Sequence, residues 1–100
     1  MYSIRYTEQA DADLFDIYVY TYETWGQEQA ITYTNGLWDA INKIAADPYS
    51  PITVDRSLLS PGCRSYYQQR HLNFYRVVDQ DIEILRILHD RMDIASRFSG

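Results

Sequence analysis

Residues 71–88 are HLNFYRVVDQDIEILRIL, two β-prone runs separated by the polar pair Asp79-Gln80. Alternating apolar and polar residues on both sides of such a pair predict a β-hairpin with a two-residue turn. This turn sets three cross-strand pairs, Val77 with Ile82, Tyr75 with Ile84, and Arg76 with Glu83. Residues 64–67 (RSYY) supply one more strand, so we predict a three-stranded antiparallel meander.

The two faces of this meander differ in character, because successive side chains of a strand point to opposite faces. We expect one face to pack against helices; it carries Tyr75, Val77, Ile82, Ile84 and Leu88. The other face carries the Arg76–Glu83 pair with Phe74, Leu85 and Ile87. This second face is too apolar to meet water, so we expect the C-terminal tail or another chain to cover it.

Before the meander, the hydrophobic period becomes helical. Residues 2–7 suit a strand, and two helical stripes follow: Ala10, Leu14, Ile17, Thr21 and Trp25, then Ala30, Tyr33, Leu37, Ile41 and Ile44. Thr7 is the expected N-cap, Gly26 the left-handed stop between the helices, and Pro48 the end of the second helix. Trp25 and Trp38 are predicted core residues, and residues 48–62 a loop. The order of strand, antiparallel helix hairpin and meander predicts an α+β fold with one small, mostly antiparallel sheet.

Composition narrows the class of protein. One hundred residues, 46% of them hydrophobic, predict a single domain spanning residues 1–100. No signal peptide or membrane-spanning run is visible, and the single cysteine, Cys63, fits a reducing cytoplasm. The net charge of −5 disfavours direct nucleic-acid binding. Eight of the nine basic residues are Arg, which favours bidentate contacts with carboxylates of a protein partner.

Spaced motifs accumulate over nearly the whole chain. They are Ala10-x-x-Asp13-Leu14-x-x-Ile17-x-x-Tyr20, Trp25-Gly26-x-x-x-Ala30-x-x-Tyr33-x-x-x-Leu37, Gly62-x-Arg64-Ser65-Tyr66, His71-x-x-Phe74-Tyr75-Arg76-Val77 and Ile84-x-Arg86-Ile87-Leu88-His89-x-Arg91-Met92-Asp93. Together they resemble the ParE branch of the ParE/RelE toxin superfamily of bacterial type II toxin–antitoxin modules. The resemblance implies a cytoplasmic toxin that inhibits DNA gyrase, a type II topoisomerase, by binding it and not by catalysis. It also implies neutralisation by a ParD-like antitoxin.

The candidate contact surface combines the Arg residues of the meander with its second apolar face. Residues expected to contact the antitoxin or the target are Arg64, Arg70, Phe74, Arg76, Leu85, Ile87, His89, Arg91 and Met92, with the tail continuing to Phe98. An amphipathic, acidic antitoxin segment would suit this surface. We predict no catalytic residue, cofactor or metal site, because His71 and His89 lack the spacing of metal ligands.

Two alternatives remain open at this point. One is a RelE-like ribosome-dependent mRNA endonuclease, in which Arg64, Arg86, His89 and Arg91 would serve the chemistry. The acidic charge and the absence of any Lys after residue 43 or Tyr after residue 75 argue against it. The other is a non-toxic antitoxin-binding module of the same fold.

Charged residues outside the contact surface give two further expectations. Arg86 should be partly buried, which requires a carboxylate from Asp93 or from the first helix. Asp11, Asp13 and Asp16 otherwise suit a solvated helix face.

Overall fold

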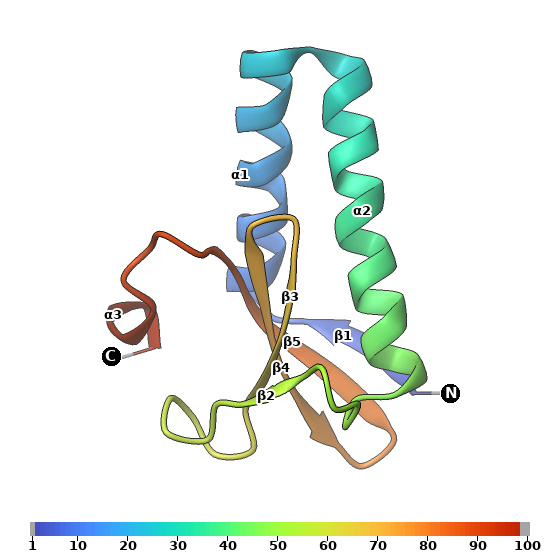
Figure 1. Ribbon diagram of the computed structural model, residues 1–100, viewed down its shortest axis with the longest axis vertical. Helices are drawn as coiled ribbons and strands as arrows, with labels where there is room; N and C mark the ends of the chain where they lie inside the picture. Colours follow the sequence, from blue (N-terminus) through green and yellow to red (C-terminus); the bar gives the residue numbers. More distant parts are fainter. Residues whose placement is uncertain (1, 99–100) are drawn as a thin grey trace.

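The computed structural model describes residues 2–98 and shows a helix hairpin standing on a twisted sheet (Figure 1). The elements are β1 (Ser3–Tyr6), α1 (Glu8–Trp25), α2 (Gln27–Ala46), β2 (Val54–Asp55), β3 (Arg64–Gln68), β4 (His71–Val78), β5 (Asp81–His89) and α3 (Ile94–Phe98). The predicted α+β class and the order strand, helix hairpin, meander are confirmed. Neither long helix is apolar enough over its length to cross a membrane.

The sheet is larger than predicted. Its strand order is β1-β5-β4-β3-β2, and β1 lies parallel to β5 while the other pairs are antiparallel. The N-terminal strand therefore extends the meander at one edge. At the other edge β2, which lies inside the predicted loop, pairs Val54 with Ser65 and Asp55 with Arg64.

The predicted hairpin register is confirmed near the turn and wrong beyond it. Val77 pairs with Ile82, Tyr75 with Ile84 and Arg76 with Glu83. Phe74 then pairs with Arg86, so Leu85 is an extra residue in β5, a β-bulge. The bulge reverses the alternation of faces: Ile87 packs in the helix-side core, and Leu88 packs on the opposite face with Phe74. Both residues were predicted on the wrong face for this reason.

The helix hairpin forms as predicted. The Thr7 side chain accepts a hydrogen bond from the Ala10 backbone N–H, and Gly26 has a φ of 95° between the helices. Trp25 and Trp38, however, are 68% and 41% exposed, so their assignment to the core is wrong. The hairpin tip, where α1 ends at Trp25, projects past the sheet (Figure 1). Trp38 lies at the hairpin's edge, edge-on to Tyr6.

The second face of the sheet is covered by the chain's own C-terminal segment. Ile94 and Phe98 of α3 pack against a buried cluster of Cys63, Phe74 and Leu88. The rings of Phe74 and Phe98 lie 5.0 Å apart in an edge-to-face arrangement. Of the two covers expected from the sequence, the tail is therefore the one present.

Candidate functional site

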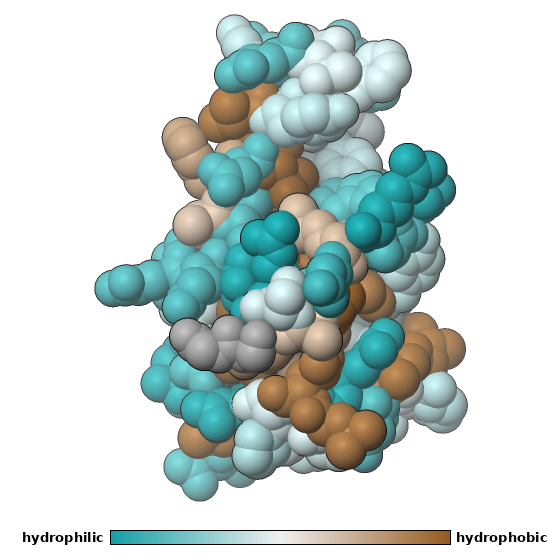
Figure 2. All heavy atoms as spheres, turned by 90° about the vertical axis from the view of Figure 1, so that its left-hand side faces the viewer, coloured by the Kyte–Doolittle hydropathy of each residue, from teal (hydrophilic) through white to brown (hydrophobic). Residues whose placement is uncertain are grey.

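A groove of about 730 Å³ opens where the hairpin tip projects past the ends of β4 and β5. It is lined by Asp13, Asp16, Ile17, Tyr20, Thr21, Trp25, Gln29, Tyr33, Arg70, His71, Arg86, Ile87, Leu88, His89, Met92 and Arg97. Figure 2 looks onto the side of α1 and α3, where hydrophobic patches are separated by hydrophilic side chains. The groove thus combines an aromatic and aliphatic lining with charged groups.

An ion pair between α1 and β5 lies at the base of the groove. Asp13 accepts hydrogen bonds from Arg86 Nε at 2.8 Å and Nη2 at 2.9 Å, and from the Ile87 backbone N–H at 2.9 Å. The pair is largely buried, and the hydrogen bond to Asp13 raises the pKa of Arg86. The expected carboxylate partner of Arg86 thus comes from the first helix and not from Asp93. The expectation of a solvated Asp13 is wrong.

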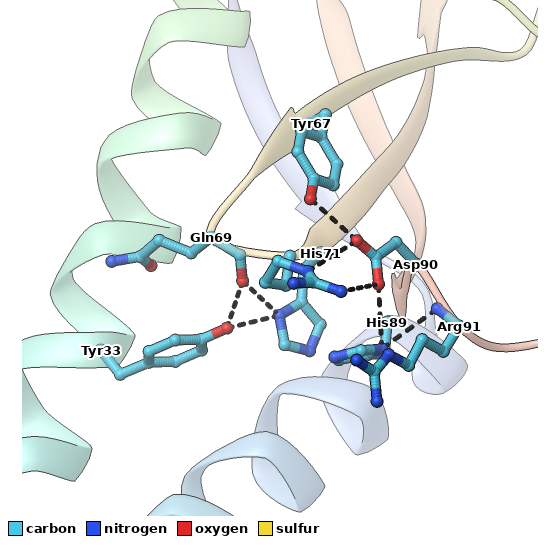
Figure 3. Close-up of polar contacts among 8 residues, drawn as sticks. Tyr33, Tyr67, Gln69, His71, His89, Asp90 and Arg91 are labelled. Carbon is cyan, nitrogen blue, oxygen red and sulfur yellow. Dashed lines mark hydrogen bonds and ion pairs between the residues drawn. The ribbon is translucent and has the colours of Figure 1, made fainter.

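A second cluster joins the β3–β4 turn to the end of β5 (Figure 3). Asp90 accepts a hydrogen bond from Arg70 Nε at 2.8 Å and one from the Tyr67 hydroxyl at 2.8 Å. The hydrogen bond from Arg70, followed by that from Tyr67, holds the pKa of Asp90 below its ordinary value. Arg70 is therefore neutralised by a carboxylate of its own chain.

His71 contacts Tyr33 of α2, and the sequence did not predict this contact. The Tyr33 hydroxyl donates to the Gln69 carbonyl and lies 2.8 Å from His71 Nδ1 (Figure 3). His71 is buried, and this burial lowers its pKa, so the ring is neutral near pH 7. Because Tyr33 belongs to the helical stripe predicted for the core, nothing in the sequence marked its hydroxyl as a site contact.

His89 stacks edge-on to His71, with 5.3 Å between ring centroids. Its Nδ1 accepts a hydrogen bond from the Arg91 backbone N–H at 3.1 Å and lies 3.3 Å from Asp90 Oδ1 (Figure 3). These contacts order the strand end. The Arg91 guanidinium, in contrast, is exposed and forms no ion pair within residues 2–98.

The nine candidate contact residues fall into separate places. Arg70, Ile87, His89 and Met92 line the groove, and Arg91 lies between His89 and Met92 in the chain. Phe74 and Leu85 pack in the cluster beneath α3 and do not form an open surface. Arg64 donates to the Thr53 hydroxyl and lies over the Tyr49 ring, whereas Arg76 pairs with Glu83.

The groove also contains Trp25, which the sequence assigned to the core, and Arg97 of the predicted contact tail. Tyr20, Trp25 and Arg97 line it, and the Arg97 guanidinium, like that of Arg91, forms no ion pair within residues 2–98. Within the same range, no group of three His, Cys, Asp or Glu side chains could hold a metal ion. A groove lined by apolar side chains and Arg97, with Arg91 next to Met92 in the chain, suits an amphipathic, acidic polypeptide segment.

Comparison with known proteins gives a consistent result. The family model "ParE toxin of type II toxin-antitoxin system, parDE" matches residues 4–94. The chain is 38% identical over 86 residues to Toxin ParE1 of Mycobacterium tuberculosis, covering 85% of this chain and 86% of the relative. It is 37% identical over 89 residues to Toxin ParE1 of Caulobacter vibrioides, covering 89% and 90%. A solved structure of the chromosomal ParDE system of P. aeruginosa superimposes with a TM-score of 0.75 at 25% identity, covering 89% and 96%.

Proposed function

The chain belongs to the ParE toxin family of type II toxin–antitoxin systems, and we propose that it inhibits DNA gyrase by binding it. A cognate antitoxin holds it inactive in the cytoplasm. The observation that carries the proposal is the family match over residues 4–94. Relatives named Toxin ParE1 and the ParDE complex add to it.

The pairing of the Arg side chains with carboxylates supports a toxin that acts by binding over one that acts by catalysis. Arg70, Arg76 and Arg86 are each paired with a carboxylate of the same chain. A guanidinium already neutralised in this way contributes less to a developing negative charge in a transition state. These three Arg residues serve the fold first, and the contact surface is built from other groups.

Of the four groups considered for ribonuclease chemistry, Arg64 lies apart from His89. Arg64 pairs with Tyr75, whereas His89 pairs with His71 four residues further along β4. Four residues of strand span about 13 Å, too far for both groups to act on one phosphate. We therefore favour a binding toxin over an mRNA endonuclease.

The groove offers a place for the antitoxin. Trp25, Tyr20 and Met92 would receive the apolar side of an amphipathic segment, and Arg91 and Arg97 would receive its carboxylates. This placement replaces the face around Phe74, because α3 covers that face. Ion pairs between the Arg91 and Arg97 guanidinium groups and acidic side chains of the antitoxin would make the affinity of the complex depend on salt concentration.

A supercoiling assay tests the proposal directly. Purified gyrase and relaxed plasmid are incubated with increasing amounts of the protein, with and without the antitoxin. We expect supercoiling to fall as the protein is added and to recover when the antitoxin is present in equimolar amount. Undiminished supercoiling at a large molar excess would show that gyrase is not the target.

A further inference from the structure

The two histidines of the chain lie side by side on the wall of the groove. His71 of β4 pairs in register with His89 of β5, and both residues line the groove. Their rings are edge-on, with 5.3 Å between centroids. The chain has no other histidine, so the two imidazoles form a single polar site within the groove.

In each ring the Nδ1 atom is occupied and the Nε2 atom is not. His71 Nδ1 lies 3.1 Å from the Gln69 carbonyl, and His89 Nδ1 accepts a hydrogen bond from the Arg91 backbone N–H at 3.1 Å (Figure 3). Neither Nε2 forms a hydrogen bond within residues 2–98. In that range Asn73 Oδ1 is the only fully buried side-chain nitrogen or oxygen without a partner, so His71 Nε2 is open to solvent. Both Nε2 atoms are therefore available to a ligand in the groove.

The Nδ1 contacts determine which nitrogen of each neutral ring carries the hydrogen. A carbonyl can only accept, and the Tyr33 hydroxyl already donates to that of Gln69, so His71 Nδ1 is a donor and its Nε2 presents a lone pair. In His89, Nδ1 is the acceptor, so Nε2 carries the hydrogen. A carboxylate between the rings would need a donor from both. His71 provides one at Nε2 only when its ring is protonated.

The charged groups around the imidazoles decide which ligand suits them. The ionisable side chains that surround His71 or line the same groove are Asp13 and Asp16 of α1, Tyr33 of α2, Tyr67 of β3, Arg70 of the β3–β4 turn, Arg86 and His89 of β5, Asp90, and Arg97 of α3. Four of them form the two ion pairs described above and cancel. Asp16 and Arg97 remain, and the exposed Arg91 guanidinium, two residues after His89, adds a second cation. This excess of positive charge favours an anion.

We propose that His71 and His89 form a subsite for one carboxylate of the antitoxin, which binds with uptake of one proton from solvent at His71 Nε2. The inference rests on the proposed function, in which an acidic antitoxin segment lies in the groove. The carboxylate accepts a hydrogen bond from each Nε2–H, and its negative charge compensates the charge that His71 acquires. The ring is thus neutral in the free protein and charged in the complex.

Proton uptake makes the affinity for the antitoxin depend on pH. Burial, the largest cause, lowers the pKa of His71 in the free protein, whereas a carboxylate in contact with the ring raises it in the complex. The gain in affinity is therefore complete below the pKa of the free protein and is lost as pH rises through the pKa of the complex. Between these two values, one proton changes the affinity by at most about tenfold per pH unit.

Calorimetry of the unmodified protein with its cognate antitoxin is the first test. Titrations in phosphate and in Tris, which differ in ionisation enthalpy, give the number of protons taken up. We expect uptake of roughly one proton near pH 7, and binding that tightens about threefold to tenfold for each pH unit of acidification between about pH 8 and 6. Binding with no uptake, as for an antitoxin hydroxyl or amide in the subsite, overturns the inference. If the unmodified protein does not bind the antitoxin at all, the proposed function is contradicted instead.

Variants assign the proton to one ring. His71→Gln should lose the uptake, and His89→Gln should bind more weakly but retain it. Gln29→Ala is the matched control, because it removes another groove side chain that does not titrate and should leave the uptake unchanged. The double variant His71→Gln with His89→Gln contains no imidazole, so any uptake that remains in it belongs to the antitoxin. Uptake that is undiminished in the double variant overturns the inference.

Two further measurements cover a misfolded variant and a different ligand. Circular dichroism checks the fold of each variant. If His71→Gln does not fold, NMR of the His71 ring in the complex of the unmodified protein decides, and a neutral ring near pH 7 overturns the inference. Binding should be unaffected by EDTA. Loss of affinity on chelation would show that the two imidazoles bind a metal ion and not a carboxylate.

Discussion

The two faces of the sheet are covered by helices of very different length. One face lies beneath α1 and α2, helices of 18 and 20 residues, and holds the larger core. The other lies beneath α3, a helix of five residues. A helix that short has no stability of its own, so its place depends on the side chains of Ile94 and Phe98. The comparison shows which face holds the fold together and which can open at low cost.

One residue connects the two faces. Arg86 donates to Asp13 of α1 and, through Nη1, to the Arg97 carbonyl of α3 at 3.4 Å. It occupies the position in β5 directly after the bulge at Leu85. The bulge thus places one guanidinium where it can reach both the long hairpin and the short tail.

Truncation of one apolar side chain on each face should reveal the difference most strongly. Ile84→Ala removes a fully buried side chain of the helix-side core and should cost about 2–5 kcal/mol of unfolding free energy. Phe98→Ala removes a partly exposed side chain from the tail and should cost roughly 1 kcal/mol. Chemical denaturation measures both. Equal losses would mean that the tail is as essential to the fold as the hairpin.

Loss of an ion pair should cost unfolding free energy in the same order as loss of an apolar side chain. Asp13→Ala leaves the buried Arg86 guanidinium and the Ile87 N–H without their acceptor, and should cost roughly 3 kcal/mol. Arg76→Ala breaks a pair whose Arg side chain is 42% exposed, and should cost less than about 1 kcal/mol. Thermal unfolding of both variants at equal concentration provides the measurement. A larger loss from Arg76→Ala would contradict the assigned role of Asp13.

Sequence patterns predicted the parts of the fold that depend on local rules. The Asp79-Gln80 pair determined the hairpin register, and Thr7 and Gly26 determined where α1 begins and ends. The bulge at Leu85 had no local signal, because both Leu85 and Arg86 fit an alternating strand. One extra residue there was enough to exchange the faces of Ile87 and Leu88.

The candidate site was harder to predict because it depends on how far the hairpin projects past the sheet. Trp25 has the spacing of a core residue, but the sheet ends before reaching it, and the space below it becomes the groove. Tyr33 likewise has core spacing, yet its hydroxyl contacts His71. Helical period identifies the side of a helix that faces inward, and only the tertiary structure shows what lies there.

Acidification should weaken the helix-covered face through His71. Burial, the largest cause, lowers the His71 pKa below its ordinary value of 6.5, despite its hydrogen bond with the Gln69 carbonyl. The folded state therefore favours the neutral ring, and this contribution to stability is complete above pH of about 6.5 and lost as pH falls through the lowered pKa. Unfolding free energy measured between pH of about 5 and 7 should rise with pH, and less so in His71→Gln.

The control for this prediction is His89→Gln, which leaves the buried ring in place and should retain most of the pH dependence. Proton NMR titration of the two imidazoles separates them. A His71 pKa at or above 6.5 would contradict the assignment of a neutral, buried ring held by Tyr33.

The smallest effect concerns the close approach of α2 to the β3–β4 turn. Gly36 lies within α2, and its carbonyl accepts a hydrogen bond from Gln68 Nε2 at 2.6 Å. The three atoms nearest to a Cβ built there belong to the Gln69 side-chain amide. Gln69 is exposed, so this flexible amide can move aside. Gly36→Ala should therefore stabilise the protein by roughly 0.5–1 kcal/mol, because Ala loses less conformational entropy than Gly in a helix.

Gly26→Ala is the matched control: nothing crowds its Cβ, but its φ of 95° should make the change cost about 1 kcal/mol or more. Chemical denaturation of the two variants separates crowding from backbone strain, and a similar loss in both would show that the turn is packed rigidly against α2.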